Sequence, residues 1–161
     1  DHFGWHPATG PDVDERDGHV FVNNLMVADA TLNRPHLFVW QRAMLCDRLR
    51  DPQFSTIDNN VYVKNGERKA MPLILWSPAQ NEQCIMAMDS PEELNKMLTG
   101  FEKNGILLTG QTVFLSPELD NYRTLPGFAG HAAAALPPAE IKSLLKMLKR
   151  SPAYVGAYPA E

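Results

Sequence analysis

A short internal repeat constrains the fold of this chain more than any other feature. Residues 17–24, Asp-Gly-His-Val-Phe-Val-Asn-Asn, align without gaps on residues 58–65, Asp-Asn-Asn-Val-Tyr-Val-Lys-Asn. Both segments are rich in β-branched and aromatic residues and are bounded by Asn, Asp or Gly, which is typical of short strands. A repeat of this kind indicates similar units that bury their apolar residues against one another.

Further repeated segments follow the first pair. Residues 35–40 resemble residues 72–76 with one residue fewer, and residues 112–116 are a weaker third copy of the first unit. The spacing between copies is irregular, which a stack of parallel strands tolerates because insertions leave it as loops. We therefore predict parallel pairing between residues 20–22 and 61–63.

The same alignment predicts that Asn24 lies over Asn65 in an asparagine stack. It also places Trp40 and Trp76 at equivalent positions, where the two rings form a ladder or pack in the core. A simple β-sandwich with two similar hairpins is the alternative to stacked strands.

Two helices are predicted. Residues 89–98 begin with a capping Asp or Ser, followed by Pro91 and then two glutamates at the positive end of the helix dipole. Residues 138–149 carry an apolar stripe opposite three lysines, as expected of an amphipathic packing helix. The predicted fold class is mainly β: right-handed parallel β-helix coils with inserted loops, one short inserted helix and a C-terminal capping helix.

Length and composition set the domain organisation. The 161 residues predict a single domain, 1–161, and a net charge of −4 argues against nucleic acid because no basic surface is required. No apolar run reaches the roughly 18 residues of a membrane-spanning helix, so no membrane partner is expected. The chain begins without Met or a signal peptide. We therefore expect the C-terminal coils and cap of a larger β-helix, with upstream coils or another chain at the N-terminal end.

Cys46 and Cys84 are the only cysteines. Each follows the second strand of its repeat, but the two are displaced unequally from Trp40 and Trp76. Because a disulfide requires close and well-oriented Cα and Cβ atoms, we predict that they do not form a structural disulfide.

The segment Val-Phe-Leu-Ser-Pro-Glu-Leu-Asp-Asn-Tyr-Arg-Thr-Leu-Pro-Gly at 113–127 resembles the final coil of secreted bacterial parallel β-helix proteins of the pectate-lyase-like and glycoside-hydrolase-like kind. The Val-Gly-Ala-Tyr-Pro sequence at 155–159 resembles their closing segment, although Phe128 to His131 depart from the pattern. The resemblance implies a carbohydrate-active protein, either a polysaccharide lyase or a glycoside hydrolase, with much of its site upstream. A noncatalytic carbohydrate-binding or structural capping β-helix segment is the alternative.

Candidate site residues lie near the N-terminus. Residues 12–17 hold four carboxylates, and glycoside hydrolysis uses paired carboxylates. We therefore predict Asp14, Glu15 and Arg16 as catalytic residues, and a solvated turn before a strand is the plainer interpretation.

Substrate binding is predicted for three neighbouring residues. Trp5 offers an aromatic face to a sugar ring, and His2 and His6 offer polar contacts. No metal site and no cofactor is predicted, but the acidic run leaves calcium open. The expected partner is a polysaccharide or oligosaccharide, and the expected location is secreted, periplasmic or at the cell surface.

Overall fold

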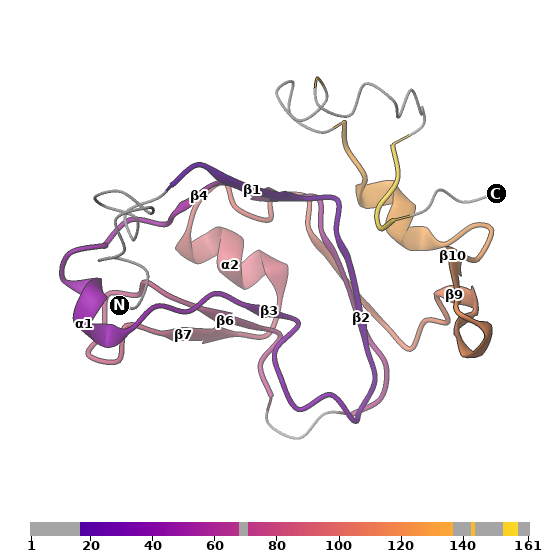
Figure 1. Cartoon of the computed structure of the whole chain (residues 1–161), viewed down its shortest axis with the longest axis horizontal. Helices are drawn as coiled ribbons and strands as arrows, with labels where there is room; N and C mark the ends of the chain where they lie inside the picture. The colour runs from indigo at the N-terminus through magenta and orange to yellow at the C-terminus, as the bar shows by residue number, and fades with distance from the viewer. Residues whose placement is uncertain (1–16, 68–70, 137–142, 144–152, 158–161) are drawn as a thin grey trace, which may run out of the picture.

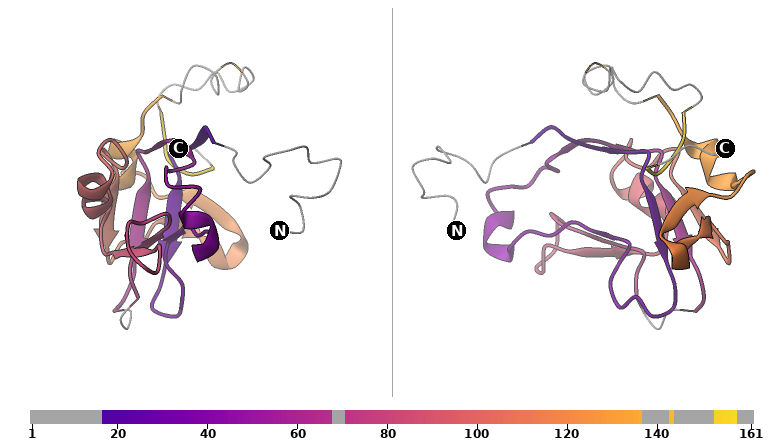
Figure 2. Two further views of the ribbon diagram at one scale, coloured as in Figure 1. Left: turned by 90° about the vertical axis from the view of Figure 1, so that its left-hand side faces the viewer. Right: turned by 45° about the vertical axis from the view of Figure 1, so that its right-hand side comes forward.

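The computed structural model describes residues 17–67, 71–136, 143 and 153–157 of the 161-residue chain (Figure 1). In chain order the described elements are β1 (His19–Val22), β2 (Leu25–Ala28), β3 (Leu37–Phe38), α1 (Ala43–Cys46), β4 (Phe54–Asp58), β5 (Val61–Lys64), β6 (Ile74–Trp76), β7 (Met86–Met88), α2 (Pro91–Met97), β8 (Ile106–Thr109), β9 (Phe114–Ser116), the 3-10 turn η3 (Pro117–Leu119), β10 (Asn121–Thr124) and the 3-10 turn η4 (Ala129–Ala133). Figures 1 and 2 place α1 at one end of the described molecule and β9, β10 and η4 at the other.

The described strands form four small, separate sheets. β1 pairs with β4, and β2, β5 and β8 form a second sheet; all of these pairs are parallel. The third sheet, β3-β6-β7, is mixed, because β3 is parallel and β7 antiparallel to β6. β9 and β10 form an antiparallel pair.

The predicted right-handed parallel β-helix is therefore wrong. The described residues form sheets of two or three strands with mixed directions and two short helices, with no closed or solenoid sheet among them. The chain reverses direction at β7 and again between β9 and β10, which a continuous parallel stack does not do. Residues 112–116 thus contribute an antiparallel strand in place of a third parallel copy, and the predicted 138–149 capping helix lies outside the described residues.

The predicted strand register is also wrong. β1 pairs with β4, so Val20 lies beside Thr56, whereas β5 pairs with β2, so Val61 lies beside Leu25. Segments 20–22 and 61–63 are in different sheets. The physical reason is a two-asparagine turn after β1 and after β4, in which the first residue, Asn23 or Asn59, has the same left-handed φ of 58°.

The buried apolar residues in the described part of the chain form two cores, one on each face of the β2-β5-β8 sheet. Tyr62 of β5 points into the first core, which contains Trp76 of β6 and Leu94 of α2, all 0% exposed. Its neighbours Val61 and Val63 point to the opposite face, as strand alternation requires. There they pack against four residues from the C-terminal part of the chain: Val113, Phe128, Ala133 and Val155.

The predicted 89–98 helix is confirmed as α2. The Ser90 hydroxyl accepts a hydrogen bond from the Glu93 backbone N–H (3.3 Å), and the Glu93 carboxylate accepts one from the Asp89 N–H (2.7 Å). This arrangement differs from a capping box in one respect, because the Glu93 carboxylate accepts the N–H of the residue before the N-cap in place of the N-cap N–H. Only two residues separate β7 from α2, so the helix folds back against the strand that precedes it.

Cys46 and Cys84 form a disulfide with a Cα–Cα distance of 6.2 Å, so the prediction of unpaired cysteines is wrong. That prediction assumed that Trp40 and Trp76 lie at equivalent positions, so the unequal distances of the two cysteines from these tryptophans suggested poor geometry. β3 and β6 pair with an offset of 37 residues, which leaves Trp40 one position beyond the partner of Trp76. The two tryptophans consequently form no ladder: Trp76 is 0% exposed and Trp40 is 60% exposed.

Candidate functional site

The site residues predicted from the sequence lie outside the described part of the chain. This holds for the catalytic candidates Asp14, Glu15 and Arg16 and for the substrate-binding candidates Trp5, His2 and His6. Their roles stay predictions.

Within the described residues, two aromatic side chains are exposed along the edge formed by β3 and the segment after it. Leu37 is buried, whereas Phe38 and Trp40 are 56% and 60% exposed. The alternation of the strand explains the pattern, since Val39 packs against the first core and its two aromatic neighbours point outward. Two large aromatic rings are thus displayed two residues apart.

Three arginines follow within the next ten residues. Arg42, Arg48 and Arg50 surround α1, and all three are exposed. The Arg50 Nε donates a hydrogen bond to the Asp47 backbone oxygen (3.0 Å), which holds that side chain near the helix. We call Phe38, Trp40, Arg42, Arg48 and Arg50 the aromatic–arginine surface.

The α1 segment is tied firmly to the rest of the molecule. The disulfide joins Cys46 of α1 to Cys84 in the turn before β7. Beside it, the Gln41 Nε2 donates hydrogen bonds to the Leu49 carbonyl (2.9 Å) and the Cys46 sulfur (3.2 Å). A short helix of four residues has little stability alone, so these links hold the arginines in place.

A pocket of about 480 Å³ opens between α1 and the turn at 78–81. Its lining includes the side chains of Arg50 and Asp47. Guanidinium groups bind phosphate oxygens, and exposed aromatic rings stack on nucleic-acid bases. The aromatic–arginine surface therefore has the two components of a single-strand nucleic-acid contact. Sequence reasoning missed it, although Phe-x-Trp-x-Arg at 38–42 carries the signal.

A second group of polar residues is sealed inside the protein. Asn60 and Glu102 are 0% and 2% exposed. One carboxylate oxygen of Glu102, Oε1, accepts hydrogen bonds from the Asn60 amide (2.7 Å) and the Tyr62 hydroxyl (2.6 Å). The other oxygen, Oε2, is buried without a hydrogen-bond partner among the described residues. This cluster is closed to solvent and acts on stability.

Burial raises the pKa of Glu102 above its ordinary value of 4.5, and the nearby Asp58 charge adds to the rise; the bonds from Tyr62 and Asn60 oppose it. Burial, together with Glu102, also raises the pKa of Tyr62. Because the folded-state pKa of Glu102 is above the unfolded value, its stabilising contribution is fully present below about pH 4.5 and is lost as pH rises through the folded pKa.

We accordingly expect Glu102→Gln to remove this part of the pH dependence. The free energy of unfolding, measured with urea from pH 4 to pH 8, should fall for the unmodified protein relative to the variant as pH rises, because glutamine does not titrate. The raised pKa of Glu102 would be contradicted if the free energies of unfolding of the two proteins changed in parallel with pH. It would also be contradicted if the unmodified protein became more stable than the variant as pH rose.

Neither a metal-binding cluster nor a membrane-spanning helix occurs in the described residues. No group of three or more His, Cys, Asp or Glu residues in the described part of the chain is arranged to hold a metal ion. Of the helices that the structure describes, none is both long and apolar enough to cross a membrane.

The described residues have mixed α/β character and form separate sheets of two or three strands. A curated protein matches over 99 residues at 24% identity: the DNA mismatch repair protein MutH of Shewanella sp. (strain MR-7). The match covers 62% of this chain and 44% of the relative, so this chain spans less than half of that protein. No family model and no solved structure matches the chain.

These findings correct the expected family and function. The resemblance to secreted β-helix proteins is wrong, because the described sheets are not a solenoid and the match is to a DNA mismatch repair protein. The predicted polysaccharide lyase or glycoside hydrolase activity, and the noncatalytic carbohydrate-binding or capping alternative, depended on that resemblance and are withdrawn with it. The pattern at 113–127 misled because its strand pairs within a hairpin.

Proposed function

We propose that this chain is part of a nuclease-like protein that acts on DNA, and that it contacts DNA through the aromatic–arginine surface. The similarity to a DNA mismatch repair protein carries the proposal. The exposed rings of Phe38 and Trp40 and the three exposed arginines that follow them in the sequence support it, because stacking and phosphate contact together are how proteins hold single-stranded nucleic acid. A net charge of −4 is compatible with this, since binding depends on local charge.

Cleavage of DNA would require more than this surface. Many nucleases position divalent cations with carboxylates, and the described residues offer no such group. The described part of the chain therefore does not fit a catalytic cation, and no catalytic step is assigned to it. Asp14 and Glu15, which lie outside the described residues, are the carboxylates that we propose to test for a role in cleavage.

DNA binding is the first test. We expect Trp40→Ala to weaken binding of a fluorescent single-stranded oligonucleotide by roughly tenfold, since base stacking contributes about 1–3 kcal/mol per ring. Fluorescence anisotropy at fixed salt measures the change. Tyr122→Ala is the matched control: this ring is 49% exposed but lies in β10, at the other end of the molecule, and its removal should leave affinity unchanged.

Salt dependence and cleavage complete the test. Arg48→Gln should reduce the slope of log affinity against log salt by about one, because one phosphate contact is lost. Nicking of supercoiled plasmid DNA with Mg²⁺, lost in Asp14→Asn, would extend the proposal to catalysis. The absence of both DNA binding and nicking would overturn it, as would binding that Trp40→Ala and Arg48→Gln leave unchanged.

The partner and location predicted from the sequence are not tested by the structure. Our proposal replaces the expectation of a polysaccharide partner and no nucleic-acid partner. A soluble polysaccharide added to the oligonucleotide-binding assay tests this: we expect it to leave DNA binding unchanged. The Cys46–Cys84 disulfide supports the expected secreted, periplasmic or cell-surface location, because disulfides persist in oxidising compartments.

A further inference from the structure

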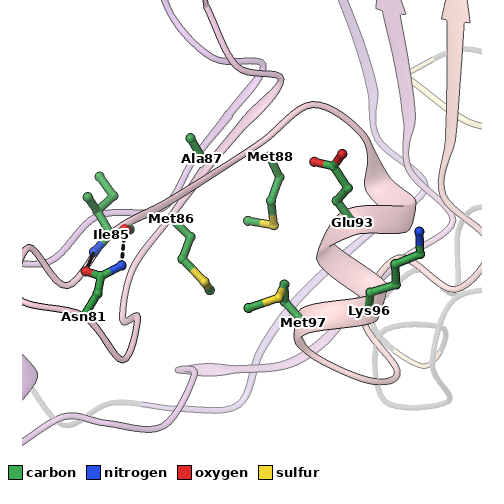
Figure 3. Close-up of a pocket in the computed structure, with 8 residues that line it drawn as sticks. All are labelled: Asn81, Ile85, Met86, Ala87, Met88, Glu93, Lys96 and Met97. Carbon is green, nitrogen blue, oxygen red and sulfur yellow. Dashed lines mark hydrogen bonds between the residues drawn. The ribbon is translucent and has the colours of Figure 1, made fainter.

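Three methionines line one open pocket on the face of the molecule between β7 and α2. The pocket has a volume of about 460 Å³. Met86 and Met88 come from β7, and Met97 comes from the last turn of α2. Figure 3 shows their three side chains turned toward the same space, with the sulfur atoms near its centre.

The local fold explains why the three side chains converge. Met86 and Met88 are two residues apart in a strand and so share one face, whereas Ala87 between them points elsewhere. The hydrogen bonds of the Ser90 and Glu93 side chains fix the start of α2, and the helix folds back on β7.

Exposure differs sharply among the three. Met88 is only 4% exposed and belongs to the first core, whereas Met97 is 58% exposed at the rim. Filling a core gap explains Met88 but not Met97, whose apolar side chain is displayed to solvent above two other thioethers.

The chemistry of the lining selects a particular kind of ligand. A thioether is a soft, uncharged donor, and soft sulfur ligands favour Cu(I) over hard cations such as Mg²⁺. The one carboxylate in the lining, Glu93, already accepts the Asp89 N–H through Oε2. The one lysine in the lining, Lys96, has its nitrogen turned away from the three sulfur atoms, as Figure 3 shows. No group of three or more His, Cys, Asp or Glu residues competes for a metal within the described residues.

We propose that Met86, Met88 and Met97 form a binding site for a soft monovalent metal ion, Cu(I). The ion lies between the strand and the helix, with the three sulfur atoms as ligands. The site is independent of the aromatic–arginine surface and of the proposed action on DNA.

The test uses Ag⁺, which has the same charge and preference for sulfur but does not change oxidation state under air. We expect isothermal titration calorimetry of the full chain to show one Ag⁺ per chain. Met97→Leu should weaken binding by at least about tenfold, as expected when a metal ligand is removed. Cu(I), supplied anaerobically against a chromogenic chelator, should show the same loss, whereas Zn²⁺ and Mg²⁺ should not bind at the pocket.

Met44→Leu is the matched control, because Met44 is 76% exposed on α1 and lies outside the pocket. Leucine nearly conserves the volume of methionine, so both variants should fold, and circular dichroism checks this. NMR of labelled methionine methyl groups provides a second measurement: Ag⁺ should shift the signals of Met86, Met88 and Met97. Equal affinity in Met97→Leu and Met44→Leu, no bound Ag⁺, or shifts at other methionines alone would overturn the proposal.

Discussion

Replacing Asn60 with alanine is expected to lower the free energy of unfolding by about 3 kcal/mol. The Asn60 amide is 0% exposed and uses its full hydrogen-bonding capacity. Its Nδ2 donates to the Phe21 carbonyl (3.0 Å) and to Glu102 Oε1 (2.7 Å), and its Oδ1 accepts from the backbone and side-chain N–H groups of Asn24 (both 2.9 Å). Truncation leaves the Asn24 backbone N–H without this acceptor and leaves the buried Glu102 carboxylate with Tyr62 as its remaining side-chain donor, which costs more than the bonds contributed.

Asn65→Ala is the control for this prediction. Asn65 also follows a strand, but its side chain makes two hydrogen bonds where Asn60 makes four: it donates to the Gln111 backbone oxygen and accepts from the Gln111 N–H, and both bonds lie at the surface. Water replaces them when the side chain is lost, so we expect a cost of about 1 kcal/mol or less. Urea unfolding at pH 7 measures both variants. Equal losses would show that the buried Asn60 network stabilises the protein no more than the two surface bonds of Asn65 do, and would contradict the prediction.

The asparagines also explain how much of the fold could be predicted. The strand at 61–63, the helix at 89–98 and the repetition of strand units were all visible in the sequence. The register was not, because Val-aromatic-Val has a period of two residues and fits more than one alignment. The pairs Asn23-Asn24 and Asn59-Asn60 specify the offset of 36 residues, since only a few residue types adopt positive φ readily.

Glu102 shows why the buried polar cluster could not be predicted. In the sequence it stands between Phe101 and Lys103 and looks like an exposed loop residue. Its burial depends on Gly105, where a side chain would overlap the Glu102 carboxylate. That dependence arises only when the loop closes on β5, so composition and periodicity do not reveal it.

The aromatic–arginine surface was partly visible in the sequence. The repeat singles out Trp40, but its expected equivalence to Trp76 suggests a ladder. The actual offset of β3 on β6 leaves one ring in the core and the other in solvent. Side chains alternate between the two faces of a strand, so the register of pairing determines which of them face outward. An error of one residue in that register therefore exchanges the buried and the exposed side chains.

Removal of the disulfide is expected to have the largest effect on stability. The Cys46–Cys84 bond closes a loop with a sequence separation of 38, and the loss of chain entropy in the unfolded state for such a loop corresponds to about 4 kcal/mol. We expect the Cys46→Ala, Cys84→Ala double variant to lose about this much free energy of unfolding in urea at pH 7. That is a large part of the roughly 5–15 kcal/mol that stabilises a typical small domain.

A reducing agent distinguishes the bond from the packing of the two side chains. Dithiothreitol should lower the stability of the unmodified protein toward that of the double variant and should leave the variant unchanged. Because the disulfide anchors α1, its reduction should also weaken oligonucleotide binding. Reduction should weaken binding by the Tyr122→Ala variant as much as binding by the unmodified protein. Thiol titration shows whether dithiothreitol has reduced the cysteines. If they are reduced and the free energy of unfolding does not fall, the disulfide does not constrain the unfolded chain. In that case the hydrogen bonds of Gln41 are sufficient to hold the α1 segment.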